Sequence, residues 1–269
     1  MKNADPLSHF FPEIEADGFS RIDSTIEFYT RVNALLNPDS MLLDFGAGRG
    51  ATHLEDTVPY RRELRNFRGK VREVIGADVD PVILTNPSLD RALVLKPIRP
   101  IPLSDECVHL IISDFTFEHI RDPSHTAGEL NRILIPGGWI CARTPNKYGY
   151  IALASQLVPE FLRMHVLRLV QPKREEQDVF RTFYRLNRLR ALRRYFSPAE
   201  YEYFVYSWDA EPAYHANSKA LFRFLLAIHR ITPPMLLTLL LIFLRKRADA
   251  TRNPSGSTGP LRPRPEVRL

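Results

Sequence analysis

Cysteine is scarce in this sequence, and its scarcity excludes one class of fold. Of 269 residues only Cys107 and Cys141 are cysteines, too few for a disulfide framework. No group of His and Cys has the spacing of a zinc site. We interpret both thiols as small core hydrophobes in a protein of a reducing compartment, and we predict no metal site.

Long apolar runs and a leader pattern are also missing. Residues 1–6 contain no basic stretch followed by an apolar run, so we expect a cytoplasmic protein without a secretory signal. The uninterrupted apolar run at 235–244 is shorter than the ~20 residues that span a bilayer. A multi-span membrane protein is therefore not expected.

What the sequence does contain fits a globular protein with a basic surface. Hydrophobic residues make up 44% and charged residues 25%, with a net charge of +6, which is compatible with a packed core and with anionic partners. Lys and Arg gather at 163–194 and again from 245 onward, whereas 39–122 is nearly balanced. An anionic partner would therefore meet the C-terminal half.

Strand and helix patterns alternate through the first half of the chain. Short apolar runs predict strands at 40–45, 70–77, 92–95, 108–113 and 139–143. Helical patterns lie between them, at 52–68 with a break at Pro59, from Asp80 and Pro81 onward, and at 123–134. This alternation predicts an α/β fold of the Rossmann-like kind, a mostly parallel sheet with helices on both faces.

The remaining segments suggest a division of the chain into four parts. Residues 1–38 form an N-terminal helical entry segment with one helix at 24–36, and residues 39–146 form the core. Residues 147–249 have helical patterns and predict a C-terminal cap that contacts substrate or membrane. Residues 250–269 have the composition of a disordered tail.

Two motifs place chemistry at the carboxyl ends of predicted strands, where open α/β sheets bind ligands. Asp44 precedes a turn containing Gly46, Gly48 and Gly50, and such glycines let backbone approach a ligand at a helix N-terminus. The alternative is a tight turn without a ligand. The turn also satisfies a loose dinucleotide-binding pattern.

The second motif puts an acid after the next strand. Asp78 ends that strand and is placed to accept hydrogen bonds from ribose hydroxyls. Asp80 precedes Pro81 and competes for this role, but it also has the position of a helix cap. Both interpretations of Asp80 stay open at this point.

The stretch at 101–146 completes a recognisable order of motifs. It reads Ile-Pro-Leu-Ser-Asp-Glu, then Leu-Ile-Ile-Ser-Asp-Phe-Thr-Phe-Glu-His-Ile, then Ile-Leu-Ile-Pro-Gly-Gly-Trp and Thr-Pro-Asn. Together with the glycine turn and Asp78, residues 41–146 resemble the core of class I S-adenosyl-L-methionine-dependent methyltransferases. The likeness is strongest to small-molecule and quinone-precursor O-methyltransferases.

The resemblance implies a cofactor and the residues around it. The glycine turn would contact the methionine part, Asp78 the ribose, and the residues after the fourth strand would border the sulfonium and the substrate. Implied cofactor contacts are Asp44, Gly46, Gly48, Gly50, Asp78, Val79, Ser113, Asp114 and Phe115. One departure is the loop at 95–99, which lacks the acid that often binds adenine; backbone groups at 102–104 are the expected substitute.

His119 is the candidate general base, with Glu118 beside it to orient it or bind a cation. An imidazole pKa of ~6.5 suits proton abstraction near neutral pH, and methyl transfer needs a base only when the acceptor is a hydroxyl or a protonated amine. The alternative is that the pair packs at a helix terminus.

The C-terminal half contains candidate residues for an acceptor-binding pocket and candidate segments for a binding surface. Residues 181–196 fit a basic amphipathic helix that binds an anionic membrane or a phosphorylated substrate, or that packs on the core. Asp178, Tyr184 and Asn187 are candidate acceptor-pocket residues. The apolar stretch at 220–244 predicts an interfacial helix, a lipid groove, a dimer face or a buried core helix.

These observations predict O-methylation of a small molecule, a glycan or a lipid-linked metabolite. Residues 181–247 are predicted to contact an anionic membrane surface, at the inner face of the membrane. A nucleic-acid partner is not expected, because no aromatic stacking pattern accompanies the basic residues. A nicotinamide-dependent oxidoreductase is the first alternative, disfavoured because Asp78 lies further from the turn than the ~20 residues usual there. A non-catalytic membrane-associated module is the second.

Overall fold

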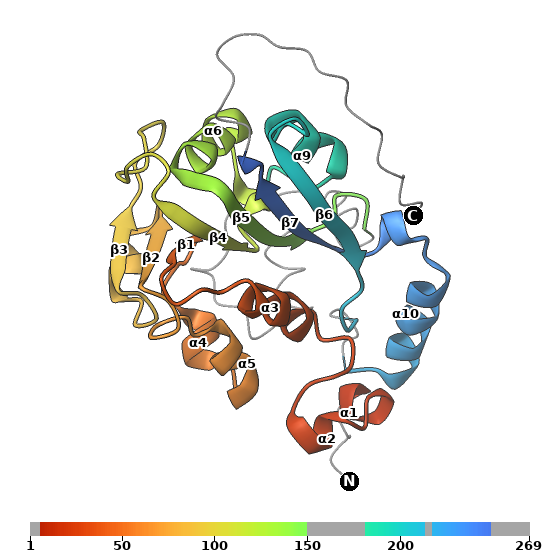
Figure 1. The fold of residues 1–269 in the computed structure, drawn as a ribbon. Coiled ribbons are helices and arrows are strands. Elements are labelled where there is room, and N and C mark those ends of the chain that lie inside the picture. Colours follow the sequence, from red (N-terminus) through yellow and green to blue (C-terminus); the bar gives the residue numbers. More distant parts are fainter. Residues whose placement is uncertain (1–5, 150–180, 213–216, 249–269) are drawn as a thin grey trace.

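The fold is a single seven-stranded sheet with helices on both faces (Figure 1). The computed structural model describes residues 6–149, 181–212 and 217–248. The strand order is β3-β2-β1-β4-β5-β7-β6. Within the described residues, no helix combines the length and apolar character needed to cross a bilayer.

The parallel half of the sheet matches the predicted alternation. It comprises β1 (Met41–Phe45), β2 (Glu73–Asp78), β3 (Arg91–Val94), β4 (Val108–Asp114) and β5 (Leu134–Pro145). Neighbours in this half pair in parallel, so their carboxyl ends meet at one edge. The predicted Rossmann-like α/β class is confirmed.

Two antiparallel strands correct the prediction of a wholly helical cap. β6 (Tyr201–Trp208) and β7 (Leu239–Lys246) pair with each other, and β7 inserts between β6 and β5. Because β7 is buried along nearly its whole length, its sequence is a continuous apolar run that periodicity cannot tell from a buried helix. The run at 235–244 is therefore mainly a core strand, and residues 201–246 belong to the same sheet as the core.

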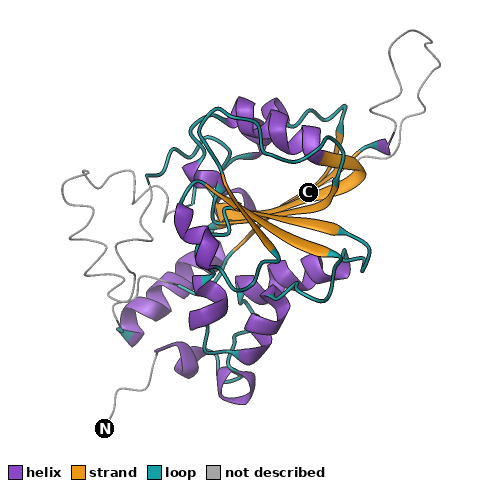
Figure 2. Ribbon diagram, turned by 90° about the vertical axis from the view of Figure 1, so that its left-hand side faces the viewer, coloured by secondary structure: helices purple, strands orange, loops and turns teal. Residues whose placement is uncertain are grey.

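Helices cover the two faces of the sheet (Figure 2). One face carries α3 (Ser24–Ala34), with α4 (Ala51–Glu55) and α5 (Pro59–Arg65) nearby, and its core includes Phe28, Val32 and Leu64. The other carries α6 (Pro123–Ile133) and α9 (Leu189–Tyr195), with Leu130 and Leu192 in its core. The shorter or peripheral elements are α1 (Pro6–Phe10), α2 (Ile14–Asp17), α10 (Lys219–Ile231) and the 3₁₀ turns η1 (Pro81–Thr85), η2 (Phe117–His119) and η4 (Pro234–Leu236).

The predicted helix at 181–196 is helical only over α9. Before it, Tyr184 has a φ of 51°, and the backbone N–H groups of Phe183 and Tyr184 donate to the carbonyl oxygen of Glu118. These bonds hold residues 181–188, a non-helical segment called here the strap, against η2. Asp178 and the predicted tail at 250–269 lie outside the described residues.

Candidate functional site

The glycine turn after β1 has a conformation that depends on glycine. Gly46, Gly48 and Gly50 have φ angles of 86°, 52° and 76°, which L side chains rarely adopt. A Cβ on Gly46 would overlap the Thr116 side chain, and one on Gly50 would overlap Asn86, whereas a Cβ on Gly48 would meet nothing within 4 Å. The turn is therefore packed behind Gly46 and Gly50 and open at Gly48.

Asp78 at the end of β2 faces this turn. Its Oδ2 accepts a hydrogen bond from the Gly48 backbone N–H at 2.9 Å, and its Oδ1 accepts from the Asp80 N–H at 2.9 Å. Asp80 turns away and caps η1 by accepting from the Val82 N–H at 2.9 Å. Of the two competing carboxylates, Asp78 is the one beside the glycine turn, while Val79 is largely exposed.

Asn86 supports the turn from behind, and no sequence motif marked it. Its side-chain amide donates to the carbonyl oxygens of Ala47 and Gly48, both at 3.1 Å. The residue is buried, so these bonds fix the backbone path of the turn in a place shielded from water. The residue sits before Pro87, where a sequence pattern suggests only a loop.

Asp44 at the end of β1 lies between two other carboxylates. Burial, together with the charges of Asp114 and Asp78, raises the pKa of Asp44 to about 7. The three acids end adjacent strands, because β1 pairs with both β2 and β4. A positive group placed among them would favour ionisation of Asp44.

Asp114 at the end of β4 is already neutralised by a buried arginine. Arg143 Nε donates to Oδ1 and its Nη2 to Oδ2, each at 2.7 Å, and the Tyr29 hydroxyl donates to Oδ2 at 3.0 Å. Burial acts to raise the pKa of Asp114, but the charge and hydrogen bonds of Arg143 outweigh it, so the pKa is lowered. The predicted ligand residue Asp114 is thus held in a fully formed ion pair.

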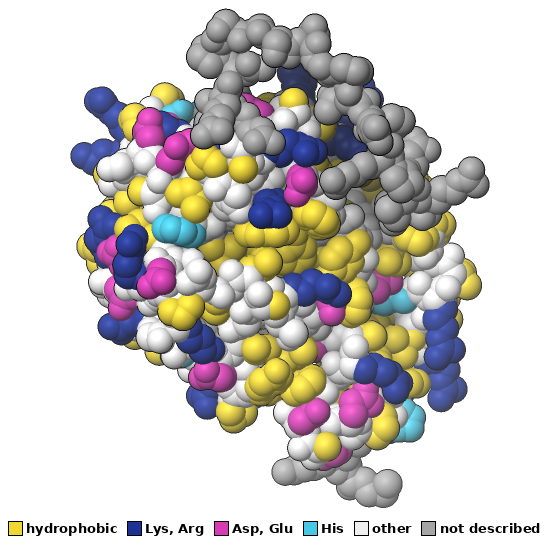
Figure 3. Space-filling view, in the orientation of Figure 1, with side chains coloured by type: hydrophobic (Ala, Val, Ile, Leu, Met, Phe, Trp, Pro, Cys, Tyr) yellow, Lys and Arg dark blue, Asp and Glu magenta, His cyan; other side chains and the backbone are white. Residues whose placement is uncertain are grey.

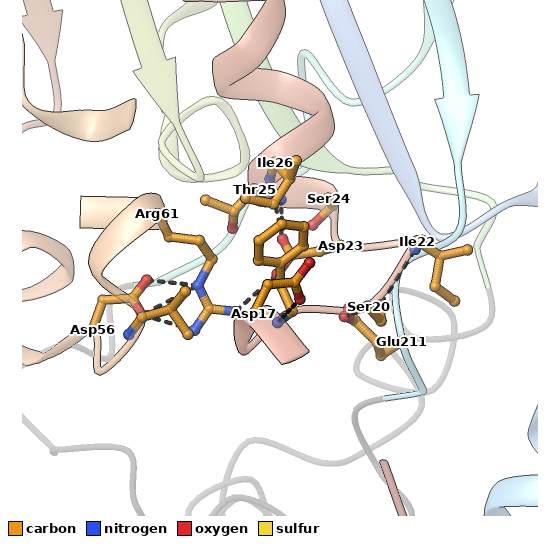
Figure 4. Close-up of polar contacts among 12 residues, drawn as sticks. Asp17, Ser20, Ile22, Asp23, Ser24, Thr25, Ile26, Asp56, Arg61 and Glu211 are labelled. Carbon is orange, nitrogen blue, oxygen red and sulfur yellow. Dashed lines mark hydrogen bonds and ion pairs between the residues drawn. The ribbon is translucent and has the colours of Figure 1, made fainter. Parts of the chain in front are cut away.

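The same arginine ties the start of α3 to the strand ends. Arg143 Nη1 donates to the hydroxyls of Ser24 and Thr25, each at 3.1 Å. These residues open α3, whose cap Asp23 accepts from the Thr25 and Ile26 N–H groups and from Arg61 (Figure 4). The N-terminal segment is therefore a wall of the site.

Ser113 and Phe115 flank Asp114 in different environments. Ser113 is fully buried, and its hydroxyl has no hydrogen-bond partner. Phe115 has a φ of 54° and is 40% exposed, and its ring lies 4.8 Å from the Arg143 guanidinium. Strain of this kind concentrates at functional sites, which makes the turn after β4 the counterpart of the glycine turn after β1.

Comparison with known families supplies the observation that decides the identity. Residues 43–142 match the family model described as a methyltransferase domain, a range that begins in β1 and ends in β5. This part of the chain, which is less than half of its length, is similar to a methyltransferase domain. The cofactor expected for such a domain is S-adenosyl-L-methionine.

Solved structures similar to this chain include proteins of several organisms. One is a chain of the complex between the Trm112 methyltransferase activator of Haloferax volcanii and a methyltransferase, with 17% identity, a TM-score of 0.49, and coverage of 88% of this chain and 92% of that one. Another is a SAM-dependent methyltransferase of Aquifex aeolicus, at 14% identity and a TM-score of 0.45, covering 91% and 98% of the two chains.

A third is geranyl diphosphate C-methyltransferase of Streptomyces coelicolor A3(2), solved with Mg²⁺, geranyl diphosphate and S-adenosyl-L-homocysteine. It shares 14% identity, with a TM-score of 0.48 and coverage of 84% of this chain and 77% of that one. No curated protein matches the sequence. At such identities the acceptors of the neighbours belong to the neighbours alone.

The structure places the predicted pair Glu118 and His119 in η2, in two environments. Glu118 is buried, and its Oε2 accepts from the Thr144 hydroxyl at 2.8 Å. Asn187 donates to Thr144 Oγ1 at 2.5 Å and to the Pro145 carbonyl oxygen at 2.9 Å. Glu118 therefore helps to hold the strap at 181–188 over the ends of β4 and β5.

His119 lies under the same strap. Its Nδ1 is 3.0 Å from the carbonyl oxygen of Arg181, and because a carbonyl oxygen can only accept, Nδ1–H donates this bond. Of the predicted acceptor-pocket residues, Asn187 is at the strand ends and Tyr184 is in the strap. In the described part of the chain, no cluster of three or more His, Cys, Asp or Glu side chains has a metal-binding arrangement.

Proposed function

We propose that the methyltransferase binds S-adenosylmethionine along the carboxyl ends of β1, β2 and β4 and transfers its methyl group to an oxygen of a small-molecule, glycan or lipid-linked acceptor. The observation that carries the proposal is the pairing of Asp78 with the open glycine of the turn. The proposed contacts are Asp44, Gly46, Gly48, Gly50, Asp78, Val79, Ser113, Asp114 and Phe115.

The residues present fit this cofactor. Each oxygen of Asp78 accepts one backbone N–H and, as a carboxylate oxygen, has a second lone pair for a ribose hydroxyl. The free space in front of Gly48 admits a ligand against the backbone. Asp44, with its raised pKa, is suited to ionise beside the positively charged amino group of the cofactor.

The acceptor is proposed to lie under the strap at 181–188. The sulfonium supplies an activated methyl group, so alignment of donor and acceptor provides most of the acceleration. His119, with its tautomer set by the Arg181 carbonyl, is the proposed base for an acceptor hydroxyl. Asn187 is fully buried, and its Oδ1 has no hydrogen-bond partner, which makes that oxygen a candidate acceptor of a substrate O–H or N–H.

The two neighbouring acids provide a matched test of the cofactor site. Calorimetric titration with S-adenosylhomocysteine should show binding by the wild-type protein and a loss of at least ~10-fold in Asp78→Asn, since a charge-assisted hydrogen bond contributes roughly 1.5–3 kcal/mol. Asp80→Asn keeps a capping side chain and should retain the affinity. NADH, titrated in parallel, should not bind.

Three outcomes would overturn the proposal. Absence of S-adenosylhomocysteine binding by a wild-type protein with a cooperative unfolding transition would remove the cofactor site. Equal losses in Asp78→Asn and Asp80→Asn would show that the Asp78 carboxylate does not hold the ligand. A preference for NADH would restore the oxidoreductase alternative.

A further inference from the structure

The exposed side of α10 carries basic and apolar side chains and no acidic one. The helix Lys219–Ile231 contains no acidic residue. One side is fixed to the protein: Phe222 is buried and stacks on Phe10 with ring centroids 5.1 Å apart, and the side chain of His229 is 8% exposed beside Asp209. The other side faces outward.

Two stripes share that outward side. Lys219, Arg223 and Arg230 are exposed and, at 3.6 residues per turn, line up along the helix. Beside them, Phe224 is 61% and Ile231 81% exposed. Figure 3 shows Lys and Arg side chains along the outer edge of α10.

The apolar stripe continues into the turn that follows α10. In η4, Met235 is 72% and Leu236 39% exposed. The Asn146 side chain donates to the carbonyl oxygens of Met235 and Leu237, both at 2.9 Å. Because Asn146 follows β5, these bonds fix the turn at the edge of the sheet where the strands β1, β2 and β4 also end.

We propose that the outward side of α10 together with η4, called here the α10 surface, docks on an anionic lipid bilayer. A helix that lies in a membrane interface needs apolar side chains to enter the acyl boundary and basic side chains next to them for lipid phosphates. The α10 surface supplies both. It narrows the membrane contact predicted from 181–247 to one helix and one turn.

The charge of the α10 surface favours an anionic bilayer over a second copy of the chain as its partner. In a two-fold contact each α10 surface would meet its own counterpart, which would bring two basic stripes together without an acid on the helix to compensate. A bilayer containing phosphatidylglycerol offers the opposite charge. Docking there would place the ends of the strands near the membrane, where an apolar acceptor is available.

The test uses the full chain, since removing residues from 220 onward would delete β7, the strand that lies between β5 and β6 in the sheet. Flotation with vesicles of phosphatidylcholine, with and without phosphatidylglycerol, measures the partition coefficient. Ile231→Ser should lower it about tenfold, because transfer of a large apolar side chain is lost. Ile98→Ser is the matched control, with the same substitution at a side chain that is also 81% exposed, and should leave binding unchanged.

A second pair of variants tests the basic stripe. Arg223→Glu with Arg230→Glu should lower binding to phosphatidylglycerol vesicles by at least about tenfold. Arg193→Glu with Arg194→Glu changes the same net charge at exposed positions of α9 and should have a much smaller effect. Thermal unfolding of each variant shows whether it is folded.

Three results would overturn the proposal. The first is that the wild-type protein does not float with anionic vesicles. The second is that both pairs of charge variants reduce binding equally, which would attribute vesicle binding to overall charge. The third is that Ile231→Ser converts a dimer to a monomer without changing flotation. Vesicle binding needs neither cofactor nor turnover. Its failure would therefore leave the methyltransferase proposal unaffected.

Discussion

The two carboxylates that end β2 and β4 occupy comparable positions and have opposite surroundings. Asp78 accepts the backbone N–H groups of Gly48 and Asp80 and lies beside an open glycine. Asp114 accepts hydrogen bonds from the buried Arg143 at both carboxylate oxygens and from the Tyr29 hydroxyl of α3. The comparison shows that carboxylates at equivalent strand ends have different roles: Asp114 joins the strand ends to Arg143, whereas Asp78 is the carboxylate proposed to bind the ligand.

Breaking the Arg143–Asp114 ion pair should have the largest effect on the free energy of unfolding. Arg143→Met would leave the Asp114 carboxylate buried without its cation, and breaking a buried pair from one side costs roughly 3–5 kcal/mol of unfolding free energy. Urea unfolding would measure this loss. By contrast, Asp78→Asn should change stability by less than about 1 kcal/mol, since its partners are backbone groups at a partly exposed site.

A double variant separates the ion pair from simple packing. Arg143→Met combined with Asp114→Asn removes both charges and should recover part of the lost stability. If the double variant were as unstable as Arg143→Met alone, the charge of Asp114 would not be the cause. The division of work between the two carboxylates would then lose its electrostatic basis.

Within the glycine turn the contrast is between a packed and an open position. In Gly46→Ala the alanine would have to adopt the left-handed φ of Gly46, and its Cβ would overlap the Thr116 side chain. We therefore expect a loss of about 2–3 kcal/mol in unfolding free energy. Gly48→Ala has the same backbone penalty without the overlap, about 1–2 kcal/mol. Gly48→Ala should instead weaken S-adenosylhomocysteine binding beyond any effect on stability, as calorimetry would show; equal stability losses in both variants would contradict the packing difference.

The sequence was sufficient to predict the strands of the parallel half of the sheet and to place Asp44 and Asp78 at strand ends, because most predicted strands there are short apolar runs that stop at or near Gly, Pro or Asp. It was insufficient for β6 and β7. β7 is buried on both sides, so apolar and polar residues do not alternate along it. The aromatic run of β6 could not be assigned to a strand without knowing that β7 pairs with it. Local patterns do not encode such long-range pairing.

The supporting residues of the site were missed for the same reason. Arg143 was assigned to a strand, yet its partner Ser24 lies 119 positions away, and Asn86 reaches the glycine turn across 38 or more positions. A charged residue inside an apolar strand was the available signal for Arg143, because a buried charge requires a partner. Which partner it finds depends on the fold.

Asp44 stands between the two contrasted acids. Its pKa is raised to about 7 by burial and by the Asp114 and Asp78 charges, so the folded, unliganded protein keeps a proton that the unfolded chain has released. Stability should therefore fall as the pH rises from about 4 to about 7 and level off above that. Asp44→Asn should lack this decline in urea unfolding, with Asp39→Asn, an exposed acid, as the control.

Ligand binding should show the opposite trend with pH. A cationic cofactor group beside Asp44 favours its ionised form, so binding releases a proton at pH values below about 7 and affinity for S-adenosylhomocysteine should rise as the pH rises toward that value. Calorimetry in buffers of different ionisation enthalpy measures the proton directly. Since Asp114 is held by Arg143 and Asp78 by backbone N–H groups, Asp44 is the acid of the three whose charge is left for the ligand to set, and proton release that persisted in Asp44→Asn would assign that role to another group.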